Sequence, residues 1–537
     1  MRIESIQITN ENKLIQDYRN QNDNLLNYFD YTYNDFSDRL LELKGRTFQR
    51  ENLVNVLYSL NKEWGAPEST LQNIERLKAA ESVVVVGGQQ AGVLTGPLYS
   101  VNKVISIIQL AKQQEKLLNI PVIPVFWIAG EDHDFEEINH VYMMTKARLK
   151  KYRVNQFNPS KTSISDIALQ DDEVNAFISI ILNQLPETQY TNEIKLIVQD
   201  CLEKSSTYVD FFARLIFQLF NQDGLVLLDS GDKRIRKLES NYFIEMIKNQ
   251  KKISQSVFNT QNDLMKQGYT IPLDVNHENG HLFYCKDDER ILLNRNEEGN
   301  WVGKQLEVIL TNEELLQIAK DFPEKLSNNV VTRPIMQDLL LPTLAFIGGP
   351  GEISYWSVLK GAFHTLNIKM PPVVPRLSLT YIDRKINKLL NKYNISLESA
   401  INGEISSIRK LWFKEKVNPP IEDTADEIKN KIAQLHEPLR NIAKIVRADL
   451  EEMADKNLDY LIKDIEFLEK RIIRALEERY EKELSDFSLL EMNLYPNGLQ
   501  ERIWNPIPYI NCYGINFFQE VNNFNLSFQQ DHFIVYI

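Results

Sequence analysis

The stretch ESVVVVGGQQAGVLTGPLYSVNK (residues 81–103), followed closely by IPVIPVFWIAGEDHDFEEINH (residues 120–140), decides the fold. Val83 to Val86 run into glycines without polar alternation, which is typical of a strand buried on both faces of a parallel sheet. Pro97 suits the first position of a helix, because its missing N–H would have no partner there. The second apolar run, residues 122–129, ends in Gly-Glu-Asp-His-Asp. The stretch therefore predicts strand, helix and strand, with polar groups where open parallel sheets bind ligands.

Three more short apolar runs follow the same plan, at residues 225–228, 343–347 and 371–376. Asp and Gly residues follow the first of them, and a Gly-Gly-Pro-Gly cluster follows the second. Five such runs separated by helical segments predict an α/β fold whose core is a Rossmann-like, doubly wound parallel sheet.

The composition describes an ordinary globular protein of 537 residues, long enough for about two or three domains. It has 61 Lys and Arg against 74 Asp and Glu, a formal charge of −13, which argues against nucleic acid as a main partner. Its three cysteines are widely spaced, as expected in a reducing compartment. No export signal begins the sequence and no apolar run is long enough to span a bilayer. We expect a cytoplasmic protein without a membrane partner.

The domain organisation changes after the fifth apolar run. We expect residues 1–382 with 487–537 to form the Rossmann-like core, and residues 383–486 to form a helical domain. Connecting insertions are expected at about residues 141–215 and 255–335, the latter rich in β-structure.

The helical domain carries apolar residues at the 4,3 spacing of a coiled coil. In its first half these are Ile428, Ile432, Leu435, Leu439, Ile442, Val446 and Met453. The spacing predicts an antiparallel pair of long helices with a turn near residues 454–457. A homodimer formed through this seam is one expectation, and a hairpin that buries the seam within itself is the other.

The tip of the first strand, Gly87 to Gly92, has the glycine spacing of a phosphate loop but lacks the Lys and Ser or Thr that should follow. What remains is a helix start at Gly96, whose backbone N–H groups could bind an anion. A tight turn without further function is the alternative. Gln89 and Gln90 favour a functional interpretation, because two amides serve a turn poorly.

The tip of the second strand carries the sharper pattern, Glu131-Asp132-His133-Asp134. Asp132 and His133 are the catalytic candidates, since such groups can orient an amine, accept its proton or assist Mg²⁺ binding. The alternative is a helix start whose acidic residues complement the helix dipole.

A metal centre is not expected. His277, His281 and Cys285 lie close in sequence, but His277 falls across a turn and a fourth ligand is missing. The sequence contains no CxxC pair, so we expect no structural zinc site.

Four motifs together resemble the cysteine ligase family of bacillithiol biosynthesis. They are GGQQAGVLTGPLYSVNK (87–103), PVFWIAGEDHDFEEINHV (124–141), FIGGPGEISYW (346–356) and LYPNGLQER (494–502). The resemblance implies ligation of cysteine to glucosaminyl malate through an amide bond. It also implies a core like that of class I aminoacyl-tRNA synthetases, a C-terminal coiled coil and a dimer.

Compared with those synthetases, the HIGH motif would fall at residues 94–97, where only the glycine remains. A KMSKS-like loop would fall at residues 375–379, which contain no lysine. The resemblance still implies activation of a carboxylate, so ATP or ADP is expected and Mg²⁺ is possible as a companion.

If this protein performs such a ligation alone, we hypothesise roles for single residues. Asp132 and His133 would orient or deprotonate the sugar amine, and Gln89, Gln90 and Gly96 would hold malate carboxylates or a phosphate. Glu352, with the backbone of Gly348 and Gly349, would take the cysteine ammonium. Trp127 and Glu131, within the second motif, complete the substrate-binding set. Two other interpretations stay open, a nucleotide-binding scaffold without catalysis and a nucleotidyltransferase with another acceptor.

Overall fold

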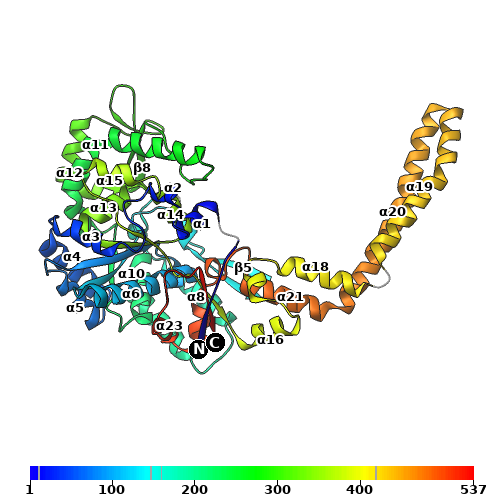
Figure 1. Cartoon of the computed structure of the whole chain (residues 1–537), viewed down its shortest axis with the longest axis horizontal. Helices are drawn as coiled ribbons and strands as arrows, with labels where there is room; N and C mark the ends of the chain where they lie inside the picture. The colour runs from blue at the N-terminus through cyan, green and yellow to red at the C-terminus, as the bar shows by residue number, and fades with distance from the viewer. Residues whose placement is uncertain (10–11, 146–147, 159, 418–419) are drawn as a thin grey trace. The chain divides into compact units, whose positions relative to one another are not determined.

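The computed structural model describes residues 1–9, 12–145, 148–158, 160–417 and 420–537. Within these ranges the chain forms two compact units, a core unit of residues 1–145, 149–381 and 500–537 and a helical unit of residues 382–499 (Figure 1). Residues 487–499, which the sequence placed with the core, group with the helical unit. The reason is that helix α21 (Glu481–Leu494) continues past residue 486 and buries Phe487, Leu490 and Leu494.

The core unit contains one parallel sheet of five strands, and each predicted apolar run forms one of them. These are β2 (Val83–Gln89), β3 (Val122–Ile128), β6 (Val226–Asp229), β12 (Thr343–Gly348) and β13 (Val373–Pro375). Their order is β13-β12-β2-β3-β6, so the chain starts in the middle, winds outward through β3 and β6, and returns to the other side. The doubly wound fold is confirmed, and its topological switch point lies between β2 and β12.

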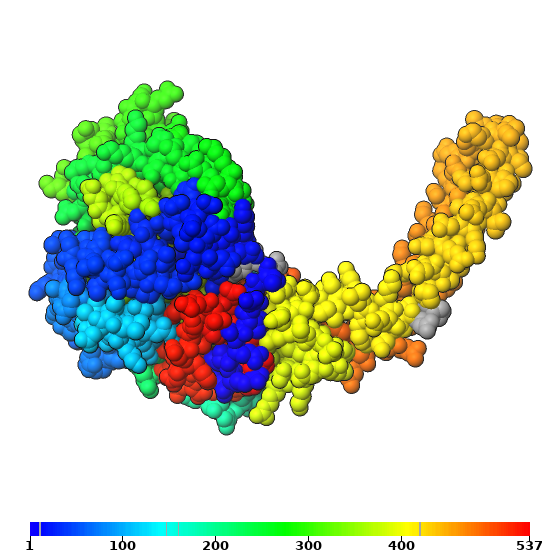
Figure 2. Space-filling model, viewed as in Figure 1, coloured from blue at the N-terminus to red at the C-terminus, as the bar shows by residue number. Residues whose placement is uncertain are grey.

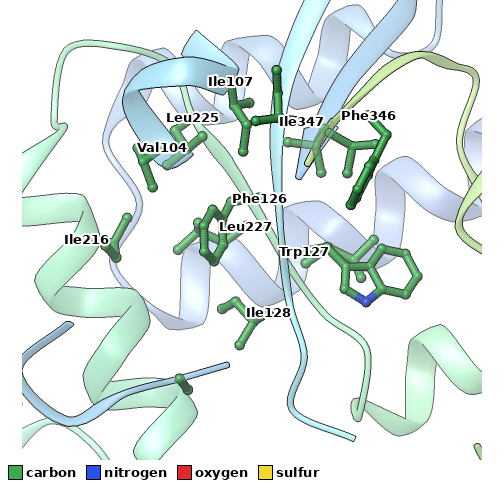
Figure 3. Packing of buried hydrophobic residues seen from close by; sticks show 14 of the residues in the cluster. Val104, Ile107, Phe126, Trp127, Ile128, Ile216, Leu225, Leu227, Phe346 and Ile347 are labelled. Atoms are coloured by element: carbon green, nitrogen blue, oxygen red, sulfur yellow. The ribbon is translucent and has the colours of Figure 1, made fainter. Parts of the chain in front are cut away.

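Both faces of the sheet are covered. Helix α6 (Leu98–Leu118) packs along β2 and β3. Phe126 and Trp127, neighbours on β3, point to opposite sides of the strand, with Phe126 on the side of Val104 (Figure 3). All four valines of β2 are buried, which explains why the strand is apolar without alternation.

The N-terminal helices protect the sheet's edges. Asn61 of α4 uses both ends of its amide to pair with the backbone of Leu227 on the edge strand β6. At the opposite edge, the Tyr18 hydroxyl of α1 donates to the carbonyl of Val373 at 2.6 Å. The helices of this region are α1 (Lys13–Arg19), α2 (Asp23–Leu26), α3 (Phe36–Lys44), α4 (Arg50–Glu63) and α5 (Glu68–Arg76).

The two ends of the chain meet in a small second sheet. Strand β1 (Arg2–Ile6) pairs with β15 (His532–Tyr536), which lies beside β14 (Leu379–Ile382). On the visible face of the core the C-terminal residues, in red, lie against N-terminal residues in blue (Figure 2). The sequence did not predict strand β1, because its partner lies at the far end of the chain.

Two insertions interrupt the parallel sheet. The first lies between β3 and β6 and consists of α7 (Phe135–Ile138), β4 (His140–Thr145), β5 (Arg148–Arg153), α8 (Asp171–Gln184), α9 (Thr191–Glu203) and α10 (Tyr208–Leu219). The second lies between β6 and β12 and begins with α11 (Lys233–Lys266), a helix of 34 residues. Its predicted β-rich part is an antiparallel sheet in the order β10-β9-β8-β7-β11.

The bounds of the remaining elements complete the core unit. The second insertion contains β7 (Asn279–Lys286), β8 (Glu289–Arg295), β9 (Trp301–Gly303), β10 (Ile309–Leu310), α12 (Asn312–Asp321), β11 (Leu326–Asn328) and α13 (Thr332–Leu340). After β12 follow α14 (Pro350–Trp356) and α15 (Lys360–Thr365), and the last segment adds α22 (Ile507–Tyr513) and α23 (Phe517–Asn522).

The helical unit consists of α16 (Arg384–Lys392), α17 (Leu397–Ile401), α18 (Ile405–Lys416), the hairpin of α19 (Ile421–Val446) and α20 (Ala448–Arg479), and α21. The predicted turn near residues 454–457 is wrong, because the chain turns at Arg447. Side-chain contacts fix this register: Lys444 pairs with Glu451, and Lys429 with Glu469. Helix α19 runs through Pro438 without ending.

The apolar seam of this hairpin lies on its outside. Leu435, Leu439, Ile442 and Val446 of α19 are 81%, 60%, 57% and 66% exposed. The helices instead face each other through contacts such as His436 with Asn457. The hairpin therefore does not bury the seam within itself. In the described part of the chain, none of the helices combines the length and apolar character needed to span a bilayer.

Candidate functional site at the strand tips

The tips of β2 and β3 are joined by a contact between two of the predicted site residues. The Gln90 amide donates to Asp132 Oδ2 at 2.9 Å and also to the carboxylate of Glu137. Gln90 and Asp132 follow neighbouring parallel strands, so the carboxyl ends of those strands bring them to one edge of the sheet. The structure thus brings the first two motifs together.

A buried lysine joins the tip of β2 to that of β12. Lys103 projects from α6 and donates to the Gly88 carbonyl at 2.7 Å and to Gln89 Oε1 at 3.2 Å, and it forms an ion pair with Glu352. Burial lowers the pKa of the Lys103 ammonium, and the charge of Glu352 opposes that shift. This group lies at the topological switch point, the usual ligand position of such folds.

The tip of β12 arranges the other side of this group. The Gly349 N–H donates to Glu352 Oε2 at 2.7 Å, so the Glu352 carboxylate accepts from both the glycine loop and Lys103. Beside it, Arg333 of α13 donates to the hydroxyl of Tyr355. Glu352, Gly348 and Gly349 therefore lie together, as predicted.

Arg376, just after β13, binds the fourth motif to the same edge. Its guanidinium makes two hydrogen bonds to the Glu501 carboxylate, at 2.7 and 2.6 Å, and its N–H donates to the Gly348 carbonyl at 2.8 Å. Burial alone would raise the pKa of Glu501, but the charge and hydrogen bonds of Arg376 hold it at about 2. Glu501 is therefore ionised, and the pair fixes residues 500–502 beneath the strand tips.

Four motifs that are far apart in the sequence therefore meet at one edge of one sheet. The model of the bacillithiol biosynthesis BshC N-terminal Rossmann-like domain matches residues 1–377, and that of the BshC C-terminal coiled-coil domain matches residues 379–537. This chain belongs to the BshC family of bacillithiol biosynthesis.

Similar proteins extend over the whole chain. One from Oceanobacillus iheyensis is 44% identical over 100% of both chains, one from Bacillus cytotoxicus 41% over 97% of both, and one from Bacillus licheniformis 40% over 100% of both. Each of the three bears the provisional name cysteine ligase BshC.

In this BshC-family chain, His133 and Asp132 share Arg290 of β8 as a neighbour. The Arg290 Nη1 lies 3.2 Å from His133 Nδ1 and 3.5 Å from Asp132 Oδ1. Arginine can only donate, so Nδ1 must accept and the proton of the neutral ring sits on Nε2. Burial, and then the charge of Arg290, lower the pKa of His133, while Asp132 opposes the shift. His133 is thus a neutral hydrogen-bond donor at Nε2, and Asp132 is the better placed proton acceptor.

Glu131 faces inward from the same loop. Its Oε2 accepts from Arg236 Nη2 at 2.6 Å and from the Asn328 N–H at 3.1 Å, and the side chain is 4% exposed. Arg236 also pairs with Glu239, whose pKa burial raises to about 8 against the charge of Arg236. Glu131 therefore ties the tip of β3 to α11 and β11. Its predicted contact with a substrate stays a prediction.

Two other predicted residues lie apart from this polar row. Trp127 is fully buried within the sheet's packing. Gly96 belongs to a buried loop in which Leu94 and Thr95 also have positive φ, and Asn505 donates to the carbonyls of Leu94 and Gly96, each at 2.8 Å. The Leu98 N–H at the helix start donates to the Trp504 carbonyl. The structure shows these contacts as internal ones, and ligand binding by Gly96 or Trp127 stays a prediction.

Sequence reasoning missed Lys103, Arg290 and Arg333. Lys103 had a usable signal: it is the sole charged residue in the otherwise uncharged segment 98–111. A helix that is almost apolar all round is buried, and a buried charge must have a partner. Arg290 and Arg333 had no such signal, because they reach the site from the second insertion.

The residues considered as metal ligands, His277, His281 and Cys285, do not form a metal site. His281 is buried beside Asn329, with 3.2 Å between its Nδ1 and the Asn329 amide nitrogen, and Cys285 lies across the ladder from Arg290. Among the described residues, no group of three or more His, Cys, Asp and Glu side chains is arranged to hold a metal ion.

Proposed function

We propose that this protein ligates cysteine to glucosaminyl malate through an amide bond, the last step of bacillithiol biosynthesis. Membership of the family and similarity over the full length support the proposal. The observation that carries it is the meeting of the four motifs at the carboxyl edge of the sheet, through the Gln90–Asp132, Lys103–Glu352 and Arg376–Glu501 contacts.

A carboxylate is a poor acyl donor, so the reaction needs an activated acyl group. We propose that ATP supplies it, leaving either ADP and phosphate or AMP and pyrophosphate. The sugar amine then attacks the acyl carbon, the C–N bond forms, the bond from the acyl carbon to the phosphoryl or adenylyl oxygen breaks, and the nitrogen loses a proton. Mg²⁺ would accompany the nucleotide through phosphate oxygens, which this ion accepts as ligands.

The proton from the amine is assigned to Asp132. Its carboxylate is about one-third exposed and is oriented by Gln90, so it can reach a substrate at the strand tip. His133 would donate from Nε2 to an oxygen of the sugar or of the acyl group, because its Nδ1 faces Arg290. Gln89, whose side-chain oxygen accepts from Lys103, is assigned to the same edge of the sheet.

The test is to incubate the purified protein with ATP, Mg²⁺, cysteine and glucosaminyl malate and to follow bacillithiol and the nucleotide products by mass spectrometry. Bacillithiol should form only when all four components are present. Absence of both bacillithiol and nucleotide turnover would refute the proposal. Exchange of pyrophosphate into ATP without dependence on cysteine would indicate a nucleotidyltransferase instead.

We also propose that the protein is a homodimer joined through the hairpin of α19 and α20. The support is the exposed apolar seam, defined here as Leu435, Leu439, Ile442 and Val446, which continues at 4,3 spacing along α19. Exposed contiguous apolar surface in a soluble protein marks an interaction site. A second copy satisfies it, since a twofold axis pairs the same surface with itself.

A further inference from the structure

The switch point contains a largely buried ion pair whose partners depend on each other. The Glu352 carboxylate contacts Lys103, and its charge also acts on Arg333 and Arg376. Arg376 is already matched by Glu501 through two hydrogen bonds, and Arg333 donates to the Tyr355 hydroxyl. Glu352 is therefore the counter-charge of Lys103.

The hydrogen bonds show which contact a ligand can replace. An ammonium donates three hydrogen bonds, and Lys103 uses all three, on Gly88, Gln89 and Glu352. The Gly88 carbonyl belongs to the sheet and cannot move away. Gln89 and Glu352 are the two side-chain acceptors, and Glu352 is the charged one, so a ligand carboxylate can take its place. The displaced Glu352 would give up the hydrogen bond from the Gly349 N–H.

The pair is reachable from one side. The Glu352 side chain is 21% exposed, whereas that of Lys103 is 1% exposed. A Cβ on Gly351 would meet no atom within 4 Å, and one on Gly349 would come nearest to Glu352 and to Arg376. The glycine loop therefore leaves free space at its surface and keeps the approach to the carboxylate clear.

We propose that an α-amino acid binds at this point by separating the Lys103–Glu352 ion pair. Its α-carboxylate takes the place of Glu352 beside Lys103, and its α-ammonium is held by the displaced Glu352 carboxylate. The inference rests on the proposed function, in which that amino acid is cysteine, and it adds Lys103 as the carboxylate-binding residue.

The charge pattern selects a zwitterion over other small ligands. A simple anion would leave Glu352 without a cation, and a dicarboxylate would also be repelled by it. A simple amine would leave Lys103 buried without its carboxylate. Unpaired buried charges are strongly unfavourable. A zwitterion restores both pairs at once and places its carboxylate among cations, where negative charge on an activated acyl group is stabilised.

The test uses the full-length protein and isothermal titration calorimetry with a series of small ligands. The series consists of cysteine, serine, cysteamine, 3-mercaptopropionate and malate. Cysteamine lacks the carboxylate of cysteine, and 3-mercaptopropionate lacks its ammonium. Cysteine should bind at least about tenfold more tightly than cysteamine and 3-mercaptopropionate, because each analogue loses one charge-assisted contact. Equal binding of cysteine and cysteamine by the wild-type protein would overturn the inference without any variant.

Variants assign the two ends of the ligand. Lys103→Met should weaken the binding of cysteine by about tenfold or more and abolish the higher affinity of cysteine over cysteamine. Glu352→Gln should abolish the higher affinity of cysteine over 3-mercaptopropionate. Lys112→Met is the matched control, since Lys112 lies on the same helix but is 56% exposed and pairs with Asp223. Retained discrimination in both site variants would overturn the inference.

The outcomes for this inference and for the proposed function are separable. If serine binds as a zwitterion with the same variant pattern and no ligation of cysteine is found, the inference stands and the proposed function fails. If cysteine is ligated but the analogues show no charge discrimination, the proposed function stands and the inference fails. Tighter binding of malate than of any amino acid would also refute the inference if Lys103→Met weakened it.

Discussion

At the scale of single residues, neighbours decide which protonation state each titratable group holds. Asp132 and His133 are adjacent in the chain and both lie beside Arg290, but Gln90 contacts only the first, and Arg290 occupies one nitrogen of the second. These contacts could not be assigned from the sequence, because Arg290 comes from a strand of the second insertion. The sequence suggested one shared role, whereas the proposed function gives the two residues different ones, a proton acceptor and a hydrogen-bond donor.

Removing the acceptor should slow catalysis more than it weakens binding. Asp132→Asn keeps an oxygen for Gln90 but removes the base, so kcat should fall by about 100-fold or more with a smaller change in KM. Asp134→Asn is the matched control, because Asp134 is an exposed carboxylate two residues away. Steady-state kinetics of bacillithiol formation measure both, and equal losses in the two variants would contradict the assignment to Asp132.

His281 makes a second prediction, about stability and pH. Burial holds the pKa of His281 at about 4, against a usual value of 6.5. The stability that depends on its neutral ring is complete above pH 6.5 and falls as the pH drops towards 4. Between pH 7 and 4.5 this loss is about 2–3 kcal/mol. The advantage of the wild type over His281→Asn in free energy of unfolding should shrink by that amount.

Urea unfolding at the two pH values measures this difference. Asparagine suits the position because His281 has a φ of 57°, a conformation that asparagine tolerates. Asp229 and Glu239 have raised pKa values, which act in the opposite sense over this range, but they are common to both proteins and cancel in the comparison. An unchanged advantage would show that His281 is not held neutral by burial.

At the scale of elements, the sequence pattern predicted the strands that nearby residues are enough to mark. The five core strands and the β-rich part of the second insertion were predicted correctly, because buried runs and turn residues mark them. Strand β1 was missed, since only pairing with β15 makes it a strand. The hairpin turn was misplaced because the 4,3 spacing was followed through Met453, which lies on α20, beyond the turn at Arg447.

The ion pair between Glu501 and Arg376 also joins distant parts of the chain, and breaking it should lower the free energy of unfolding. Glu501→Gln leaves Arg376 buried without its carboxylate, so we expect a loss of about 3–5 kcal/mol in free energy of unfolding. The double variant Arg376→Met with Glu501→Met should recover part of this loss, because no isolated charge stays buried. Urea midpoints measure both. A neutral Glu501→Gln variant would contradict a structural role for the pair.

At the scale of the whole molecule, the exposed seam on α19 predicts the oligomeric state. Leu439→Glu with Ile442→Glu places two charges on side chains that are already 60% and 57% exposed, so each chain should still fold. The substituted seam should no longer bury apolar surface against a second copy, and like charges should repel across the twofold axis. Analytical ultracentrifugation should therefore show a dimer for the wild type and a monomer for the variant.

The matched control is Gln434→Glu with Asn441→Glu, which adds the same charge at exposed polar positions of the same helix. This variant should remain dimeric, because its substitutions leave the seam intact. If both variants stay dimeric, the interface lies elsewhere on the chain. If both become monomeric, net charge on α19 rather than its apolar seam controls association. Because the strand-tip contacts described here all come from one chain, the monomeric variant should still bind cysteine.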